Sequence, residues 1–335
     1  MNTKPIRVAI VGCGLIGKKR AAQMKASGGE VVFACDTNLK AAKDLAAPFS
    51  GCQVTENIAD IAASPNVDAV MIATTNSALA PLALASIRAR KHVLLEKPCG
   101  LVASEVADLE RAAIENKVSV RAGYNHRYHP ALTKAHEIFR SGALGPMMFI
   151  RARYGHGGRI GYDKEWRANP KLSGGGELID QGSHLIDLAG WFLGDFEFVQ
   201  GRAETYFWDM PVDDNAFIHL KTAGGQTAFL QASCTEWKNL FSFEIYGKNA
   251  KLHIEGLGGS YGLEKLHYYK MLPEMGPPET LVYEYPRGDE SWKIEMAEFF
   301  QDCRTGRTPE PGLKEARKVL EIVGKIYQQS GMRNL

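Results

Sequence analysis

Short apolar runs alternate with helical stretches over the first third of the chain. Residues 6–11 open the series with mainly β-branched side chains. The further apolar runs are residues 31–35, 67–73, 92–95 and 118–122. The stretches of helical composition between them are residues 15–27, 81–90 and 104–116. Short continuous apolar runs are typical of strands buried on both faces of a parallel sheet, so this alternation predicts a doubly wound α/β domain.

The pattern changes after residue 122. A helix over residues 131–140 and a strand over residues 147–154 begin this part of the chain. The further strands, expected to pair antiparallel, are residues 196–207, 216–221, 226–234, 241–246 and 251–255. The remaining helices are expected at residues 177–193, 292–304 and 313–329, and residues 256–278 are expected to form a loop. We therefore predict an α/β domain of residues 1–122 and an α+β domain of residues 123–335.

Composition and charge narrow the class of protein. The formal net charge is +2 over 335 residues, which argues against a protein dedicated to nucleic acid or a membrane surface. No apolar run approaches the ~20 residues of a membrane helix, and the first residues lead into a strand without a signal peptide. The six cysteines are scattered without a C-x-x-C pair, as is typical of reduced thiols. We expect a cytoplasmic protein without a bound metal.

A glycine-rich turn between the first strand and the first helix indicates a dinucleotide site. Gly12, Gly14 and Gly17 occupy the three positions of a G-x-G-x-x-G motif. In this context the glycines permit a tight turn, close approach to a pyrophosphate and close packing of helix on strand. The first helical residues, whose unpaired N–H groups can bind phosphate, are Leu15 and Ile16.

The residue after the second strand selects between NAD and NADP. Asp36 stands 19 residues after Gly17, where a carboxylate accepts hydrogen bonds from the adenosine ribose. The same carboxylate repels the additional phosphate of NADP. A strand–turn–helix without a ligand is the competing interpretation, and the motif, its context and Asp36 together disfavour it. The sequence therefore predicts NAD as the cofactor.

Two further segments carry groups suited to hydride transfer. Lys97 follows the strand of residues 92–95, and ligands of doubly wound sheets bind beyond the carboxyl ends of the strands. Asp180 and His184 are four residues apart in a predicted helix and share one helical face. A histidine can accept a hydroxyl proton as hydride leaves the carbon, an aspartate can orient the imidazole, and a lysine can stabilise the alkoxide. Taken singly, Lys97 and the Asp180–His184 pair also fit solvated surface groups.

Five segments in order along the chain resemble the glucose–fructose oxidoreductase, inositol dehydrogenase and MocA family. They are residues 12–17, Glu96-Lys97-Pro98, residues 122–128 (A-G-Y-N-H-R-Y), Trp166-Arg167, and residues 174–187 (G-G-G-E-L-I-D-Q-G-S-H-L-I-D). The resemblance covers nearly the whole chain. It implies an N-terminal Rossmann domain and a C-terminal α+β domain with a large open, mainly antiparallel sheet. It also implies a homodimer or homotetramer formed through that sheet, and the predicted run of strands with few covering helices agrees.

The resemblance also implies roles for single residues. Lys97, Asp180 and His184 are the catalytic set, with His184 as the general acid and base. Beyond the glycine motif, the expected cofactor contacts are Asp36, Thr74, Asn76, Glu96, Lys97, Asn125, Trp166 and Arg167. The expected substrate contacts are Lys97, Asn125, Tyr154, Arg159, Arg167, Asp180 and His184. Residues 74–79 read T-T-N-S-A-L and depart from the family's T-P-N-x-x-H pattern, which weakens the case for a cofactor contact from Thr75.

Three other protein classes share some of these features. A non-catalytic NAD-binding sensor or regulator would share the fold, but this chain retains the whole catalytic set. A short-chain dehydrogenase needs a Tyr-x-x-x-Lys pair, and Tyr261 and Lys265 have that spacing only within the expected loop. A zinc-dependent alcohol dehydrogenase needs clustered Cys and His ligands, which the sequence lacks.

The substrate class has two candidate answers. Similarity over the whole chain favours a nucleotide sugar, UDP-N-acetylglucosamine oxidised at carbon 3. A cationic stretch before the catalytic helix supports it, because arginine can bind a diphosphate bidentately. Its members are Arg151, Arg153, Arg159, Lys164 and Arg167. The alternative is a dehydrogenase of a free sugar or inositol.

Overall fold

The chain forms two compact units that do not each consist of one continuous segment. The protein is described by a computed structural model that covers residues 4–332. The first unit runs to Tyr124 and also includes Trp292–Leu320. The second unit consists of Asn125–Ser291 and the chain from Glu321 onward. The predicted boundary at residues 122 and 123 thus falls within two residues of the first crossing, but it assigned Trp292–Leu320 to the second domain.

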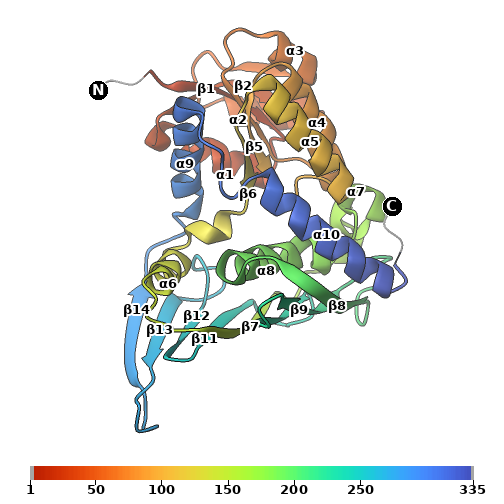
Figure 1. Cartoon of the computed structure of the whole chain (residues 1–335). Helices are drawn as coiled ribbons and strands as arrows, with labels where there is room; N and C mark the ends of the chain where they lie inside the picture. Colours follow the sequence, from red (N-terminus) through yellow and green to blue (C-terminus); the bar gives the residue numbers. More distant parts are fainter. Residues whose placement is uncertain (1–3, 333–335) are drawn as a thin grey trace. The chain divides into compact units, whose positions relative to one another are not determined.

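A six-stranded parallel sheet with the order β3-β2-β1-β4-β5-β6 forms the first unit (Figure 1). The strands are β1 (Ile6–Val11), β2 (Gly29–Cys35), β3 (Gln53–Thr55), β4 (Ala69–Ile72), β5 (His92–Glu96) and β6 (Val120–Gly123). The helices are α1 (Leu15–Gln23), α2 (Leu39–Ala46), α3 (Ile58–Ala63), α4 (Asn76–Arg88), α5 (Ala103–Asn116) and all but the first residue of α9 (Ser291–Thr305). Val8, Ala9 and Ile10 are fully buried, which is why their segment is continuously apolar. The predicted doubly wound α/β fold is confirmed.

The late segment Trp292–Leu320 belongs to the first unit because its side chains complete the core there. Met296, Phe299 and Phe300 of α9 are fully buried in one apolar cluster with residues of β1, β2 and α1. Figure 1 shows α9, coloured blue, beside the red elements of the N-terminus. A buried ion pair adds to the apolar contacts, with Arg121 Nε of β6 2.7 Å from Asp302 Oδ2 of α9.

An eight-stranded sheet with the order β14-β13-β12-β11-β7-β10-β9-β8 forms the second unit. Its strands are β7 (Met147–Gly155), β8 (Phe196–Glu204), β9 (Asn215–Thr222), β10 (Thr227–Ser233), β11 (Leu240–Gly247), β12 (Ala250–Glu255), β13 (Glu264–Lys270) and β14 (Glu279–Tyr285). All neighbours pair antiparallel except β7 and β10, which are parallel. The expected large, mainly antiparallel sheet is confirmed, but β13 lies within residues 256–278, where a loop was expected.

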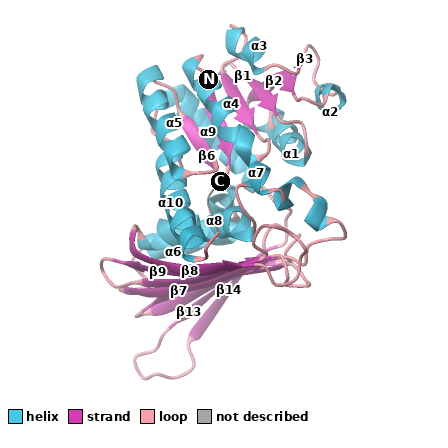
Figure 2. Cartoon of the chain, turned by 90° about the vertical axis from the view of Figure 1, so that its right-hand side faces the viewer, coloured by secondary structure: helices cyan, strands magenta, loops and turns pink. Residues whose placement is uncertain are grey.

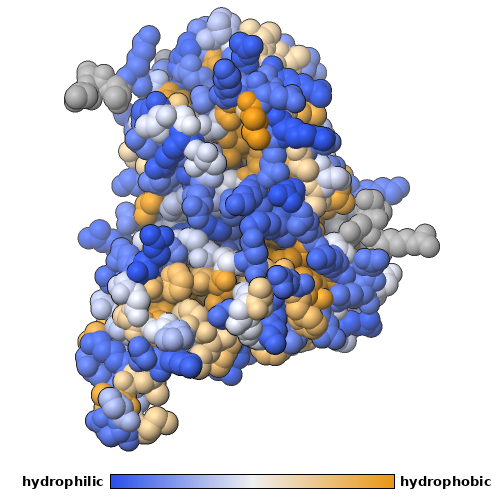
Figure 3. Space-filling model, viewed as in Figure 1, coloured by the Kyte–Doolittle hydropathy of each residue, from blue (hydrophilic) through white to orange (hydrophobic). Residues whose placement is uncertain are grey.

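Among the residues that the structure describes, helices cover only one face of this second sheet. The helices of this unit are α6 (Pro130–Arg140), α7 (Pro170–Ser173), α8 (Glu177–Leu193) and the last part of α10 (Leu313–Gln329). Figure 2 shows α6 and α8 on one side of the strands and loops but no helix on the other. The strands alternate accordingly: in β9, Ala216, Ile218 and Leu220 are buried, while Phe217 is 43% exposed. Hydrophilic residues cover most of the molecular face drawn in Figure 3, and hydrophobic residues appear there in separate patches.

Candidate functional site

The three glycines of the turn in the first unit differ in the room around them. Gly12 has a φ of +91°, and a Cβ there would lie 2.3 Å from the carbonyl oxygen of Ala73. A Cβ on Gly17 would lie 1.9 Å from the carbonyl oxygen of Gly12. A Cβ on Gly14 would have no atom of the described residues within 4 Å, its two neighbours in the chain aside. The protein's own packing therefore requires Gly12 and Gly17, whereas the space beside Gly14 is available to a ligand.

Asp36 is fixed against the same turn. It follows β2 directly, and its Oδ2 accepts a hydrogen bond from the backbone N–H of Cys13 at 2.7 Å. Its Oδ1 accepts from the backbone N–H of Asn38 at 2.8 Å. The open space beside Gly14, the start of α1 at Leu15 and the Asp36 carboxylate are the parts that an adenosine diphosphate group requires, so these residues fit NAD.

Thr74 and Asn76 lie at the carboxyl edge of the same sheet. A Cβ on Gly12 would approach Thr74 Cγ2 to 3.0 Å, so Thr74 borders the glycine turn. Thr75 is the N-cap residue of α4 but its side chain makes no capping hydrogen bond, and Asn76 is buried in the first turn. Thr74 thus borders the predicted cofactor site.

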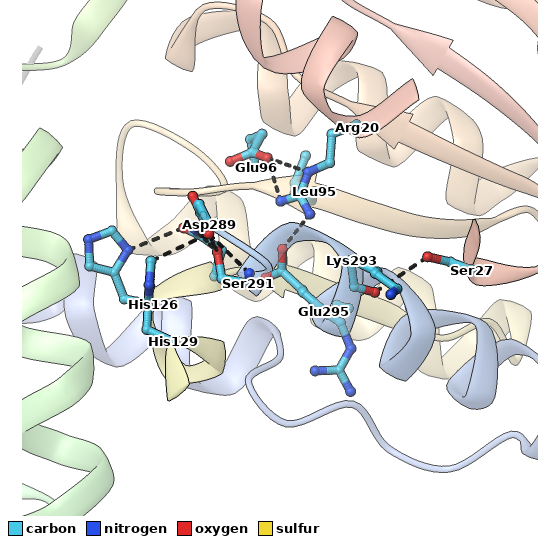
Figure 4. Close-up of polar contacts among 12 residues, drawn as sticks. Arg20, Ser27, Leu95, Glu96, His126, His129, Asp289, Ser291, Lys293 and Glu295 are labelled. Atoms are coloured by element: carbon cyan, nitrogen blue, oxygen red, sulfur yellow. Dashed lines mark hydrogen bonds and ion pairs between the residues drawn. The ribbon is translucent and has the colours of Figure 1, made fainter. Parts of the chain in front are cut away.

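Lys97 follows β5, and a buried ion cluster holds the residue before it. Nε and Nη2 of Arg20 donate to Glu96 Oε1 at 2.9 and 2.5 Å. Nη1 of Arg20 donates to Glu295, and the ring of Trp292 lies 4.5 Å from the guanidinium carbon. Burial raises the pKa of Glu295 to about 7, although the Arg20 charge opposes the rise. Figure 4 shows Arg20 between the two carboxylates. Arg20 therefore anchors Glu96, and with it the end of β5, to α1 and α9.

Helix α8 of the second unit carries Asp180 and His184, one turn apart. Asp180 Oδ2 accepts a hydrogen bond from Arg167 Nε at 3.0 Å. The Arg167 guanidinium also lies over the ring of Trp166, with 4.7 Å between its carbon and the ring centroid. His184 is 5% exposed. The structure thus brings Asp180, Arg167 and Trp166 together.

Aromatic rings surround His184. The His126 ring is stacked on it with 3.7 Å between centroids, and Tyr154 approaches it edge-on at 6.2 Å. Tyr154 in turn contacts Tyr261, with 5.1 Å between centroids. Lys265, by contrast, forms an ion pair with Glu284 at 2.7 Å. Tyr261 therefore belongs to the aromatic cluster around His184. Its Tyr-x-x-x-Lys spacing to Lys265 has no structural counterpart, because Lys265 pairs with Glu284 instead.

A buried carboxyl network lies one turn before Asp180, and sequence reasoning missed it. The hydroxyl of Tyr162 donates to Glu177 Oε1 at 2.7 Å, and His156 Nε2 lies 3.7 Å from the same oxygen. Burial raises the pKa of Glu177 to about 8, and the Asp180 charge adds to the rise. Burial therefore favours the neutral form of the Glu177 carboxyl group. Its i, i+3 spacing to Asp180 on a predicted helix was the available signal.

The cationic stretch predicted for a diphosphate does not gather in one place. Side chains alternate along β7, so Arg151 and Arg153 lie on the open face of the sheet while Ala152 and Tyr154 face the helices. Arg151 pairs with Glu244 there at 2.5 Å. Arg159 pairs instead with Glu165 at 2.7 Å. The arginines of the stretch are therefore divided between the open face of the sheet, where Arg151 and Arg153 lie, and the carboxylates Glu165 and Asp180, which pair with Arg159 and Arg167.

Two family models match consecutive parts of the chain. Residues 6–124 match the oxidoreductase family with an NAD-binding Rossmann fold. Residues 132–253 match the GFO/IDH/MocA C-terminal domain. The chain belongs to the GFO/IDH/MocA oxidoreductase family. Of the residues of this family member that were predicted to bind NAD, those from Gly12 to Lys97 lie in the matching Rossmann segment, whereas Asn125, Trp166 and Arg167 lie outside it.

Several proteins that resemble this GFO/IDH/MocA member are named dehydrogenases. Levoglucosan dehydrogenase of Pseudarthrobacter phenanthrenivorans is 24% identical over 65% of this chain and 63% of its own length. Inositol 2-dehydrogenase of Rubrobacter xylanophilus is 27% identical over 77% of this chain and 74% of its own. A solved structure of levoglucosan dehydrogenase with NADH superposes with a TM-score of 0.88 at 21% identity, over 98% of this chain and 97% of that one. That superposition shows the shared fold.

The described part of this GFO/IDH/MocA protein contains neither a metal-binding cluster nor a membrane-spanning helix. Over residues 4–332, no group of three or more His, Cys, Asp and Glu side chains could hold a metal ion. Within the same residues no helix is long and apolar enough to cross a bilayer. All six cysteines are free thiols.

Replacing Asp36 by serine is expected to narrow the cofactor preference of this GFO/IDH/MocA enzyme. Serine keeps an acceptor near the Cys13 N–H group but removes the charge that opposes a 2′-phosphate. We expect the ratio of kcat/KM for NAD to that for NADP to fall by about tenfold, or ~1.4 kcal/mol. Steady-state rates with both cofactors measure it. Asp44→Ser, which removes an exposed carboxylate paired with Lys40, should leave the ratio unchanged. Equal use of both cofactors by the unaltered enzyme would contradict the role of Asp36.

Proposed function

We propose that the chain oxidises a secondary hydroxyl group of a free sugar or cyclitol with NAD, or reduces the corresponding ketone. The main observation in favour of a free sugar or cyclitol is that carboxylates pair with the arginines near Asp180. Arg167 is bound by Asp180 and lies 3.8 Å from Glu165, and Arg159 pairs with Glu165. Carboxylates thus already neutralise these guanidinium groups, which a diphosphate would need for itself. The names of the relatives, levoglucosan and inositol dehydrogenases, support the same class.

Each unit supplies a different part of the proposed reaction. The glycine turn and Asp36 of the first unit would hold NAD, which would supply the hydride acceptor, and Lys97 of the same unit would stabilise the alkoxide through its ammonium group. In the second unit, His184 accepts the hydroxyl proton, so the alcohol loses one proton and one hydride and becomes a ketone. Asp180 holds Arg167 and, through its charge, favours the protonated imidazole one helical turn away. The buried aromatic rings around His184 exclude water from the proton acceptor.

A substrate panel separates the two substrate classes. NADH formation is measured with free hexoses, levoglucosan, inositols and UDP-N-acetylhexosamines. We expect turnover with members of the free-sugar or inositol groups, and neither binding nor inhibition by UDP. If a UDP-sugar is the best substrate and UDP competes with it in a salt-sensitive manner, the nucleotide-sugar alternative replaces this proposal.

The open face of the second sheet is expected to bind a second copy of the chain. Phe198, Phe217 and Phe229 lie on the adjacent strands β8, β9 and β10 and are 44%, 43% and 52% exposed. They line a groove of about 780 Å³ on this face. Three neighbouring phenylalanines in an open groove leave apolar surface that a sheet-to-sheet contact would bury.

A charge placed in this groove should dissociate the oligomer. We expect the unaltered chain to be a dimer or tetramer at micromolar concentration and the Phe217→Glu, Phe229→Glu double variant to shift toward monomer, because association would bury both carboxylates. Sedimentation velocity measures both masses. Ile114→Glu, at a 77% exposed position on α5, is the control and should leave the mass unchanged. A monomeric unaltered chain would contradict this prediction.

A further inference from the structure

His126 makes the closest ring contact with His184. Their centroids are 3.7 Å apart and their planes differ by 19°, which is face-to-face stacking. His126 comes from the short 3-10 helix Asn125–Tyr128, whereas His184 comes from α8. Only 6% of His126 is exposed. The family resemblance gave Asn125 a role but none to the residue that follows it.

Neighbouring rings hold His126 from several other directions. Tyr154 is tilted against it at 5.2 Å, and His129 and Phe241 approach edge-on at 5.6 and 6.2 Å. The rings come from β7, β11 and the segment around the 3-10 helix. With this many contacts the His126 ring has one orientation, and the ring stacked on it is confined as well.

A chain of hydrogen bonds with a defined direction determines the tautomer of His126. Asp289 Oδ1 lies 2.5 Å from Ser291 Oγ, and a carboxylate can only accept, so the serine hydroxyl donates there. Ser291 Oγ must then accept from Asn125 Nδ2, which lies 2.9 Å away. With its amide nitrogen used in this way, Asn125 presents its carbonyl oxygen Oδ1 to His126 Nδ1 at 3.2 Å. His126 must therefore carry a proton on Nδ1.

The Asp289 carboxylate, where this series of hydrogen bonds begins, is held in place by further contacts. The backbone N–H of Ser291 also donates to Asp289 Oδ1 at 3.0 Å, and Ser291 is fully buried. His129 Nε2 lies 3.8 Å from the same carboxylate oxygen, and its Nδ1 lies 3.0 Å from Glu264 Oε2. Figure 4 shows Ser291 and Asp289 beside His126 and His129. The carboxylate that sets the direction of these hydrogen bonds is thus held in place by several groups.

We infer that His126 is a positioning residue, which the Asp289–Ser291–Asn125 chain holds as the Nδ1–H tautomer with its ring flat against His184, so that the His184 imidazole keeps the plane needed for proton transfer. This inference rests on the proposed function, in which His184 accepts the hydroxyl proton. A proton acceptor works only when its lone pair points at the donor, and two free torsions of a histidine would otherwise allow many ring planes.

Substitutions separate the flat ring from its nitrogens. His126→Ala removes the stacking surface, and we expect kcat to fall by about tenfold or more with NADH affinity unchanged. His126→Phe keeps a flat ring and should recover kcat to within about threefold of the unaltered enzyme. If His126 served only in folding, both variants would have a lower melting temperature, and kcat would not differ between His126→Ala and His126→Phe in this way. Unaltered kcat in His126→Ala, or equal loss in both variants, overturns the inference.

The tautomer is tested without any turnover. Long-range nitrogen–proton spectra of the nine histidines distinguish Nδ1–H from Nε2–H imidazoles, and the spectrum of His126→Phe identifies the His126 signals. We expect an Nδ1–H pattern for His126. In Ser291→Ala, which removes the hydroxyl group that links Asp289 to Asn125, this pattern should be lost or mixed with the Nε2–H pattern. An Nε2–H pattern in the unaltered protein overturns the inference. If the proposed function fails instead, no panel substrate is turned over while the Nδ1–H pattern remains.

Discussion

Replacing His184 by alanine is expected to lower kcat by about 100-fold or more, with the affinity for NAD unchanged within about twofold. The imidazole is the proton acceptor of the proposed reaction, and a buried site offers no ready water to replace it. NAD affinity should survive because the glycine turn and Asp36 belong to the other unit. Lys97→Ala should cause a loss of similar size, since the alkoxide would form without its cation.

Turnover is measured with the best substrate of the panel, and cofactor affinity by titration of NADH fluorescence. Asp180→Asn should give an intermediate loss, because the amide can still accept from Arg167 but no longer carries a charge beside His184. His267→Ala is the matched control. It removes an imidazole that pairs with Glu255 at 3.1 Å on the open face of the sheet, and kcat should not change. Near-normal turnover of His184→Ala would remove His184 from the mechanism.

A single methyl group on Gly14 is expected to abolish most of the NAD affinity without unfolding the protein. Apart from the two neighbours of Gly14 in the chain, no atom of residues 4–332 lies within 4 Å of the position of that Cβ, so the fold accommodates alanine. The pyrophosphate of NAD would approach the same position, and the methyl group would displace it. We expect NAD to bind at least about tenfold more weakly, which corresponds to ~1.4 kcal/mol, and the melting temperature to stay within a few degrees.

Gly12→Ala is the matched comparison. Unlike Gly14→Ala, it should lower the stability of the fold. Its Cβ would lie 2.3 Å from a backbone oxygen at a φ of +91°, so the turn itself must move. We expect a loss of about 2 kcal/mol or more and a melting temperature lower by several degrees. Calorimetry and NADH titration on both variants measure the two effects. Equal destabilisation by the two substitutions would show that the space beside Gly14 is not open.

Elements with a strong period were predictable from the sequence, and those without one were not. β1, α8 and α10 have the predicted bounds, because long apolar periods leave little choice of ends. The short elements β3 and α3 carry too few residues to show a period. β13 alternates, with Leu266 buried between half-buried neighbours, but it follows a glycine-rich stretch that predicted a loop. β14 packs at the sheet edge with most residues exposed, so it has no apolar face to detect.

The candidate site divides in the same way. Gly12, Gly14, Gly17, Asp36 and Lys97 could be placed from motifs, because each motif has a fixed position relative to a strand. The contacts of His126 with His184 and of Glu96 with Arg20 join residues 58 and 76 positions apart, and no period along the chain reports such pairs. The cationic stretch shows the same limit, since neighbours in sequence such as Arg153 and Tyr154 point to opposite faces of a strand, and the sequence alone does not say which arginines lie together.

The return of the chain to its first unit affects the order in which the protein can be completed during synthesis. The strands of the first sheet are all made by residue 124, but Met296, Phe299 and Phe300 reach its core only much later. At roughly 5–20 residues per second, the ribosome needs on the order of 10–40 s to reach them. Throughout that interval the nascent first unit lacks its α9 aromatic side chains and exposes an apolar surface suited to a chaperone. The first unit is thus completed only after Asn125–Ser291 of the second unit has been synthesised.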